Sequence, residues 1–122
     1  HMEFGAALRP INFGGWASGE HHTATDTPEF WLRYWIQAFE EVVATRTENV
    51  VVVSYERCCQ DPPAAMRALA EALTANDPER LLAQASRYRP PTAHEARPID
   101  VSQDLASRAE DLHERLLALS VT

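Results

Sequence analysis

Tyr55 and Glu56 have the clearest potential for chemistry, because of where the sequence predicts that they lie. They directly follow four consecutive valines, Val50–Val53. Consecutive β-branched residues favour an extended strand over a helix, and we expect a strand at about residues 50–55. In open α/β sheets, ligands bind outside the carboxyl ends of the strands. A tyrosine at such a position can face a planar ring or hydrogen-bond a ligand, although the pattern alone favours a tyrosine packed in the core.

The positively charged groups of this chain are of one kind. All eleven basic residues other than histidine are arginine, so the chain alone cannot supply a catalytic or phosphate-binding lysine. Arg87 and Arg89 lie in a proline- and arginine-rich stretch that has no periodicity and predicts a loop after a helix. A guanidinium group in such a loop can bind a phosphate with two hydrogen bonds. Ordinary surface charge is the alternative for both arginines.

His21 and His22, close to Asp26, are the candidate metal ligands near the start of the chain. Adjacent histidines point in different directions in most backbones, and no cysteine or carboxylate cluster completes a ligand set. We therefore expect no metal site, and we interpret both histidines as possible polar contacts to a substrate.

Cys58 and Cys59 are adjacent and lack the Cys-x-x-Cys spacing of redox pairs. Adjacent cysteines rarely form an ordinary disulfide, and two cysteines do not make a secreted disulfide framework. We expect both to be partly buried small hydrophobic residues of a cytoplasmic protein, in a reducing compartment.

Length and charge limit the possible functions. The chain has 122 residues and a net charge of −7. That length suits a single domain, and the negative charge argues against binding to nucleic acids or anionic membranes. No apolar run approaches the roughly 18–20 residues of a membrane-spanning helix.

Helix start signals recur along the chain, each an N-cap residue followed by proline at the first helical position. Residues 1–27 contain all four glycines and predict loop or irregular structure. We expect a helix from Pro28 to about Ala44 and a last helix from near Ser102. The start signals are Thr27-Pro28, Asp61-Pro62 and Asp77-Pro78.

The valine run has no apparent partner within the chain. A continuous apolar run predicts a strand covered on both faces, yet no second segment has comparable strand character. A buried strand left alone would carry unpaired backbone groups, at about 1–3 kcal/mol for each. We therefore expect the neighbouring strands to come from a missing N-terminal portion or from another chain. Residues 1–122 would then be the C-terminal part of a larger domain.

A family resemblance rests on the segment that begins with the valine run. The strand, Tyr55-Glu56, Asp61-Pro62 and the helix with Met66, Leu69 and Leu73 together resemble the C-terminal half of sulfotransferases that use 3′-phosphoadenosine-5′-phosphosulfate (PAPS). In that family a tryptophan-bearing helix precedes the strand, and here the predicted helix with Trp31 and Trp35 precedes the valine run. The chain departs from the family pattern at Arg57, where an aspartate is usual, and at Leu73-Thr74, where Leu-Gly is common.

The resemblance implies a partial three-layer α/β fold of the P-loop nucleoside-triphosphatase type, mostly helical here, with one central strand. Its activity would be transfer of a sulfuryl group from PAPS to a hydroxyl or amine acceptor. Tyr55 would line the adenine pocket, and Arg87 and Arg89 are our candidates for the cofactor's phosphates. His21 and His22 would lie in a substrate-side loop. The family's phosphosulfate loop and catalytic base have no counterpart here, so we assign no catalytic residue and predict that this chain alone is inactive.

Two other functions remain open at this point. One is a non-catalytic, mostly helical interaction module that pairs its strand with a partner, and the other is part of a P-loop nucleotide kinase. The environment of Tyr55 discriminates between the sulfotransferase and the interaction module. An open position beside Glu56 and Arg89 favours the enzyme, whereas burial beneath Trp31 or Trp35 favours the interaction module.

Overall fold

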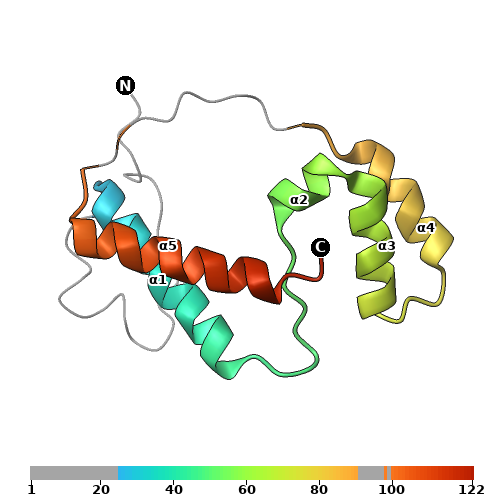
Figure 1. Ribbon diagram of the computed structural model, residues 1–122, viewed down its shortest axis with the longest axis horizontal. Helices are drawn as coiled ribbons and strands as arrows, with labels where there is room; N and C mark the ends of the chain where they lie inside the picture. The colour runs from blue at the N-terminus through green and yellow to red at the C-terminus, as the bar shows by residue number, and fades with distance from the viewer. Residues whose placement is uncertain (1–24, 91–97, 99) are drawn as a thin grey trace. The chain divides into compact units, whose positions relative to one another are not determined.

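The computed structural model describes residues 25–90, 98 and 100–122 (Figure 1). The chain divides into two compact units, which are described separately below. The first contains His1–Arg46 and Ala96–His113, and the second contains Thr47–Glu95 and Glu114–Thr122. Within the described ranges, no helix is both long and apolar enough to span a membrane.

Helix α1 (Pro28–Thr45) begins as the sequence predicts. The Phe30 N–H donates to the Thr27 side-chain oxygen at 3.3 Å, and proline occupies the first turn. Phe30 and Ile36 are the buried residues of the helix. Val42 follows Trp31, Trp35 and Ala38 at the spacing of one helix face, but it is 37% exposed, so the buried face is narrower than this apolar stripe.

Helix α5 (Gln103–Leu119) crosses α1 in the view of Figure 1; its residues 103–113 belong to the first unit and the rest to the second. Leu105 and Leu112 are buried on its apolar face. Arg108 donates two hydrogen bonds to the Glu40 carboxylate, at 3.0 and 2.7 Å, and this carboxylate raises the pKa of Arg108. This bidentate pair joins the two helices at the surface.

The second unit is built around three short helices and a 3₁₀ turn. Cys58, Ala65 and Met66 form its buried centre. Partly buried residues pack around them: Leu69, Leu81, Leu82, Ala85 and Tyr88. The elements are α2 (Tyr55–Gln60), α3 (Pro62–Ala72), α4 (Pro78–Leu82) and the 3₁₀ helix η3 (Ala83–Arg87).

Aspartate caps define where α3 and α4 begin. Asp61 accepts a hydrogen bond from the Ala64 N–H, and Asp77 accepts one from the Arg80 N–H, both at 3.1 Å. Each cap is followed by proline, which fixes the backbone dihedral of the first helical residue. These two predicted helix starts are confirmed.

The turn from α3 to α4 has the geometry of a Schellman cap. The Ala75 N–H donates to the Ala70 carbonyl at 2.9 Å, and the Thr74 N–H donates to the Glu71 carbonyl at 3.1 Å. Thr74 occupies the left-handed position, with φ of 49°. Glycine is the usual residue there, because a Cβ atom is disfavoured at positive φ.

The predicted α/β fold with a central strand at about residues 50–55 is wrong. The described residues contain helices and no β-strand; Val52 forms one isolated parallel bridge with Ser120. Two features shorten the extended segment. The Ser54 side chain accepts a hydrogen bond from the Arg57 N–H and so starts α2 at Tyr55. On the other side of the pair, the segment that bridges to Val52 consists only of residues near Ser120. Tyr55 and Glu56 are therefore the first turn of a helix.

Candidate functional site

Tyr55 lies on the surface of the second unit, where its ring meets that of Tyr88. Tyr55 is 63% exposed, so it is not buried beneath other aromatic residues. The two ring centroids are 6.2 Å apart, with an interplanar angle of 43°. Tyr88 follows η3 and is half-buried against the helical core. One ring is thus anchored and the other is open to solvent.

Cys59 lies one helical turn after Tyr55 on α2 and affects the pKa of its phenol. A side-chain hydrogen bond with Cys59 is the main reason why the pKa of Tyr55 is raised above its ordinary value of 10.0, with the charge of Cys59 contributing next. The phenol is therefore neutral throughout the physiological pH range. Cys59 itself is 7% exposed, whereas the Tyr55 ring is open to solvent.

Arg87 and Arg89 flank Tyr88 in sequence, and both are exposed. Arg87 ends η3, and Arg89 follows in an extended stretch. Neither guanidinium group has an ion-pair partner among the residues that the structure describes. The structure thus brings together Tyr55 and Tyr88, with two cationic side chains next to Tyr88 in the chain.

The other predicted contacts, His21 and His22, lie outside the described residues. Within the described ranges, no group of three or more histidine, cysteine or acidic residues is arranged to hold a metal ion.

A second polar cluster surrounds Ser54, which is 8% exposed. Its hydroxyl donates to the Glu56 carboxylate at 3.1 Å, and its N–H donates to the side-chain oxygens of Ser120 (3.0 Å) and Thr122 (3.1 Å). A nucleophilic serine needs an adjacent general base with access to substrate. Here the hydroxyl caps α2 and is buried, so the cluster is structural: it fastens residues Ser120 and Thr122 to the extended segment.

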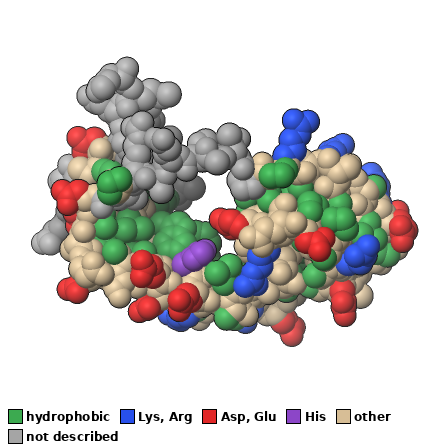
Figure 2. Space-filling model, turned by 45° about the horizontal axis from the view of Figure 1, so that its top comes forward, with side chains coloured by type: hydrophobic (Ala, Val, Ile, Leu, Met, Phe, Trp, Pro, Cys, Tyr) green, Lys and Arg blue, Asp and Glu red, His purple; other side chains and the backbone are tan. Residues whose placement is uncertain are grey.

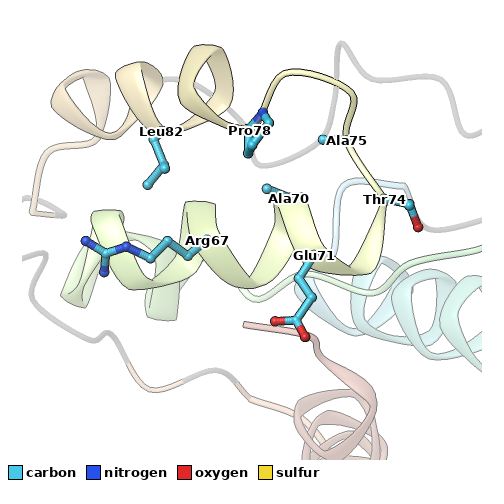
Figure 3. A pocket seen from close by; sticks show the side chains of 7 residues that line it. All are labelled: Arg67, Ala70, Glu71, Thr74, Ala75, Pro78 and Leu82. Carbon is cyan, nitrogen blue, oxygen red and sulfur yellow. The ribbon is translucent and has the colours of Figure 1, made fainter.

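A hollow of about 430 Å³ lies between α3 and α4 (Figure 3). Its sides are small or apolar, with Ala70 on α3 opposite Pro78 and Leu82 on α4. Figure 3 shows Glu71 pointing away from α4 and Arg67 extending along α3, so these charged groups do not converge on one point. Ligand sites combine an apolar wall with convergent polar groups, which this hollow lacks.

A second hollow of about 580 Å³ lies beside α4 and η3, and its lining includes Arg80, Arg87, Leu73 and Leu81. Figure 2 shows that arginine and acidic side chains alternate with hydrophobic ones over the part of the molecule that contains α3 and α4. The surface is therefore mixed in charge. Tyr55 lines neither hollow.

Comparisons with known proteins provide no relative for this chain. No protein-family model, no curated protein and no solved structure matches it.

Sequence reasoning missed two members of the Tyr55 site, Tyr88 and Cys59. The Arg87-Tyr88-Arg89 triplet was a usable signal, because an aromatic ring between two arginines is a common way to present a flat face next to positive charge. Cys59 could be found only after Tyr55 was recognised as helical, since residues i and i+4 share a helix face.

Proposed function

We propose that this chain is the nucleotide-facing part of a sulfotransferase that transfers a sulfuryl group from PAPS to a hydroxyl or amine acceptor. The observation that carries the proposal is the exposed Tyr55 ring beside Tyr88, with Arg87 and Arg89 adjacent in sequence. The resemblance around Tyr55-Glu56 and Asp61-Pro62 supports the same assignment. Adenine would lie against Tyr55, and the arginines would contact the phosphates.

The geometry of the tyrosine pair is suited to a purine ring. Tyr88 is packed against the core, and the exposed Tyr55 ring lies beside it. Stacking of a base on an aromatic side chain contributes about 1–3 kcal/mol. A tyrosine is uncharged at neutral pH, and the pKa of Tyr55 is raised above its ordinary value, so the ring does not repel the phosphates.

The proposal assigns nucleotide binding to this chain and leaves sulfuryl transfer to groups elsewhere. Sulfuryl transfer requires positive charge around the oxygens of the transferred group. This chain has no lysine and a net charge of −7. Its position in the reaction is therefore to hold the nucleotide while the acceptor oxygen or nitrogen attacks sulfur and adenosine 3′,5′-bisphosphate leaves.

The test is binding of adenosine 3′,5′-bisphosphate to the full 122-residue chain, measured by isothermal titration calorimetry. We expect saturable binding that Tyr55→Ala weakens by about 10-fold, as the loss of one stacking face predicts. Tyr55→Phe keeps the ring and is the matched control, so its affinity should stay within about twofold. Equal binding by the wild-type chain and Tyr55→Ala would remove the basis of the proposal.

A second ligand separates sulfotransferase from nucleotide kinase. PAPS carries a 3′-phosphate, whereas a kinase substrate such as AMP carries only the 5′-phosphate. We expect the bisphosphate to bind more tightly than AMP, and Arg87→Ala or Arg89→Ala to reduce that preference. Tighter binding of AMP would favour the kinase instead.

A further inference from the structure

Two arginines line the hollow beside α4 and η3. Arg80 lies on α4 and Arg87 ends η3, and these two helical segments follow one another along the chain without a break. Both side chains therefore contribute to one concave surface of a single compact unit. The volume of the hollow, about 580 Å³, is in the range of sites that bind small molecules.

The two arginines give this hollow an excess of positive charge. Among the residues that the structure describes, no carboxylate lies within ion-pair distance of Arg80 or Arg87. Asp77 is the acidic residue in the described lining, and its Oδ1 already accepts a hydrogen bond from the Arg80 N–H at 3.1 Å. Glu79 is also on α4 but does not line the hollow. The lining thus has two cationic groups and one anionic group.

The charge of the rest of the chain is less important for a small ligand. The chain carries −7 in total, which opposes the approach of anions from a distance. At physiological salt, however, exposed charges are largely screened beyond about 8 Å, so the groups that line the hollow decide what it binds.

The remainder of the lining includes apolar side chains. Leu73 is 53% exposed, and Leu81 is half-buried against the core of the unit. An exposed leucine is stabilised when an aliphatic group covers it and removes it from water. The hollow therefore suits a ligand that has both a negative charge and an apolar chain.

The balance of charge favours a carboxylate as the anionic group. A guanidinium fork can donate two parallel hydrogen bonds to a carboxylate or a phosphate. One positive charge in excess is matched by a singly charged carboxylate, whereas a doubly charged phosphate monoester would leave negative charge beside Asp77.

We propose that the hollow beside α4 and η3 binds a small aliphatic carboxylate, whose charged group is held by Arg80 and Arg87. Its chain covers Leu73 and Leu81. The inference goes beyond nucleotide binding, because Tyr55 does not line this hollow and the ligand is of a different class. Arg87 is shared by the two proposals, so the test variants are made at Arg80 and Leu73.

The experiment titrates the full 122-residue chain with sodium octanoate and follows the backbone amides by ¹H–¹⁵N NMR. We expect saturable shifts that are largest at Ala75, Leu81 and Gln84, which line the hollow. Octanamide has the same chain without the charge and should bind at least about 10-fold more weakly. Equal affinities for the two ligands, or the largest shifts outside the hollow, would overturn the proposal.

A matched pair of arginine variants separates a local site from the effect of net charge. Arg80→Ala removes one guanidinium group from the hollow and should weaken octanoate binding at least about fivefold. Arg67→Ala makes the same change of charge at an exposed position of α3 outside this hollow, so its affinity should stay within about twofold. Equal losses for the two variants would show that binding follows net charge alone and would overturn the proposal.

Leu73→Ala tests the contact with the aliphatic chain. It should reduce the preference for octanoate over butyrate at least about threefold, and an unchanged preference would contradict the proposed position of the chain. Leu73 and Arg80 are both exposed, and the amide spectra show whether each variant is folded. Failure of octanoate to bind would overturn this proposal and leave nucleotide binding at Tyr55 untouched.

Discussion

The α3–α4 hairpin and the segment Val50–Ser54 belong to the same compact unit, but they satisfy their backbones in opposite ways. Each helix of the hairpin has an aspartate cap, and a Schellman turn joins them, so the donors and acceptors at the helix ends have partners nearby in sequence. The extended segment forms its hydrogen bonds with residues more than sixty positions away, and these residues pair with one of its two edges. The helix ends of this unit are therefore satisfied by residues nearby in sequence, whereas the extended segment is paired by residues far along the chain.

The largest expected effect is at the centre of the hairpin. Met66 is 2% exposed, and Met66→Ala should lower the free energy of unfolding by about 2–5 kcal/mol, because it leaves a cavity that the surrounding helices cannot close. Urea unfolding followed by circular dichroism measures this. Met66→Leu keeps the volume and should cost less than about 1.5 kcal/mol. Similar losses for both variants would mean that the stability contributed by Met66 does not depend on its packing volume.

The second-largest expected effect is the loss of stability when a helix cap is removed. Asp61→Ala removes the acceptor for the Ala64 N–H and should lower the free energy of unfolding by about 1 kcal/mol. Asp61→Asn retains an acceptor oxygen and should cost less. The same urea titration measures both variants, and an alanine variant as stable as the wild type would contradict the role of the cap.

Thr74 is a position where the hairpin can be improved. With φ of 49°, its Cβ atom is disfavoured, so Thr74→Gly should raise the free energy of unfolding by about 0.5–1 kcal/mol. Thr74→Ala keeps a Cβ atom and should gain less. Thermal unfolding by calorimetry gives the order of the three proteins; a destabilised glycine variant would show that the threonine side chain has a stabilising contact.

The valine segment should tolerate polar substitution where the hairpin does not. Val53 is 42% exposed, and Val53→Thr conserves its shape, so the free energy of unfolding should change by less than about 0.5 kcal/mol. Ala65→Thr places the same polar group in the buried centre of the hairpin and should cost several times more. Equal costs measured in urea would erase the contrast between the two regions.

The smallest effect concerns the proton on Tyr55. Its pKa is raised in the fold, so the folded state binds this proton more tightly; that contribution is present below pH 10.0 and is lost as the pH rises through the folded pKa. Cys59→Ala should bring the pKa of Tyr55 back toward 10.0, whereas Cys58→Ala should leave it unchanged. Phenolate absorbance, taken as the difference from Tyr55→Phe, measures this pKa. A Cys58→Ala shift as large as that of Cys59→Ala would reassign the hydrogen bond.

The same contrast explains how much of the fold the sequence predicts. Helix starts at Thr27, Asp61 and Asp77 are signalled by residues within one turn, and the structure confirms all three. The strand fails because β pairing depends on distant residues, and nothing near Val50–Val53 specifies Ser120 as a partner. Ser54 is the local signal that was overlooked, because a serine cap can begin a helix immediately after a valine run.

The candidate site follows the same rule. Tyr55 and the arginines are recognised by residue type, and their chemistry follows from the side chains alone. The pairing of Tyr55 with Tyr88, 33 positions later, depends on how α2 and η3 pack around Met66, which the sequence does not encode locally. The i, i+4 contact from Tyr55 to Cys59 depends on the helix that replaced the predicted strand.

The distribution of two residue types gives each compact unit its own spectroscopic reporter. All three tryptophans, at positions 16, 31 and 35, belong to the first unit, and both thiols, Cys58 and Cys59, belong to the second, where they are 1% and 7% exposed. Indole emission therefore follows one unit, and the rate of alkylation by iodoacetamide follows the opening of the other. Any cooperativity between them can be read in a single unlabelled sample.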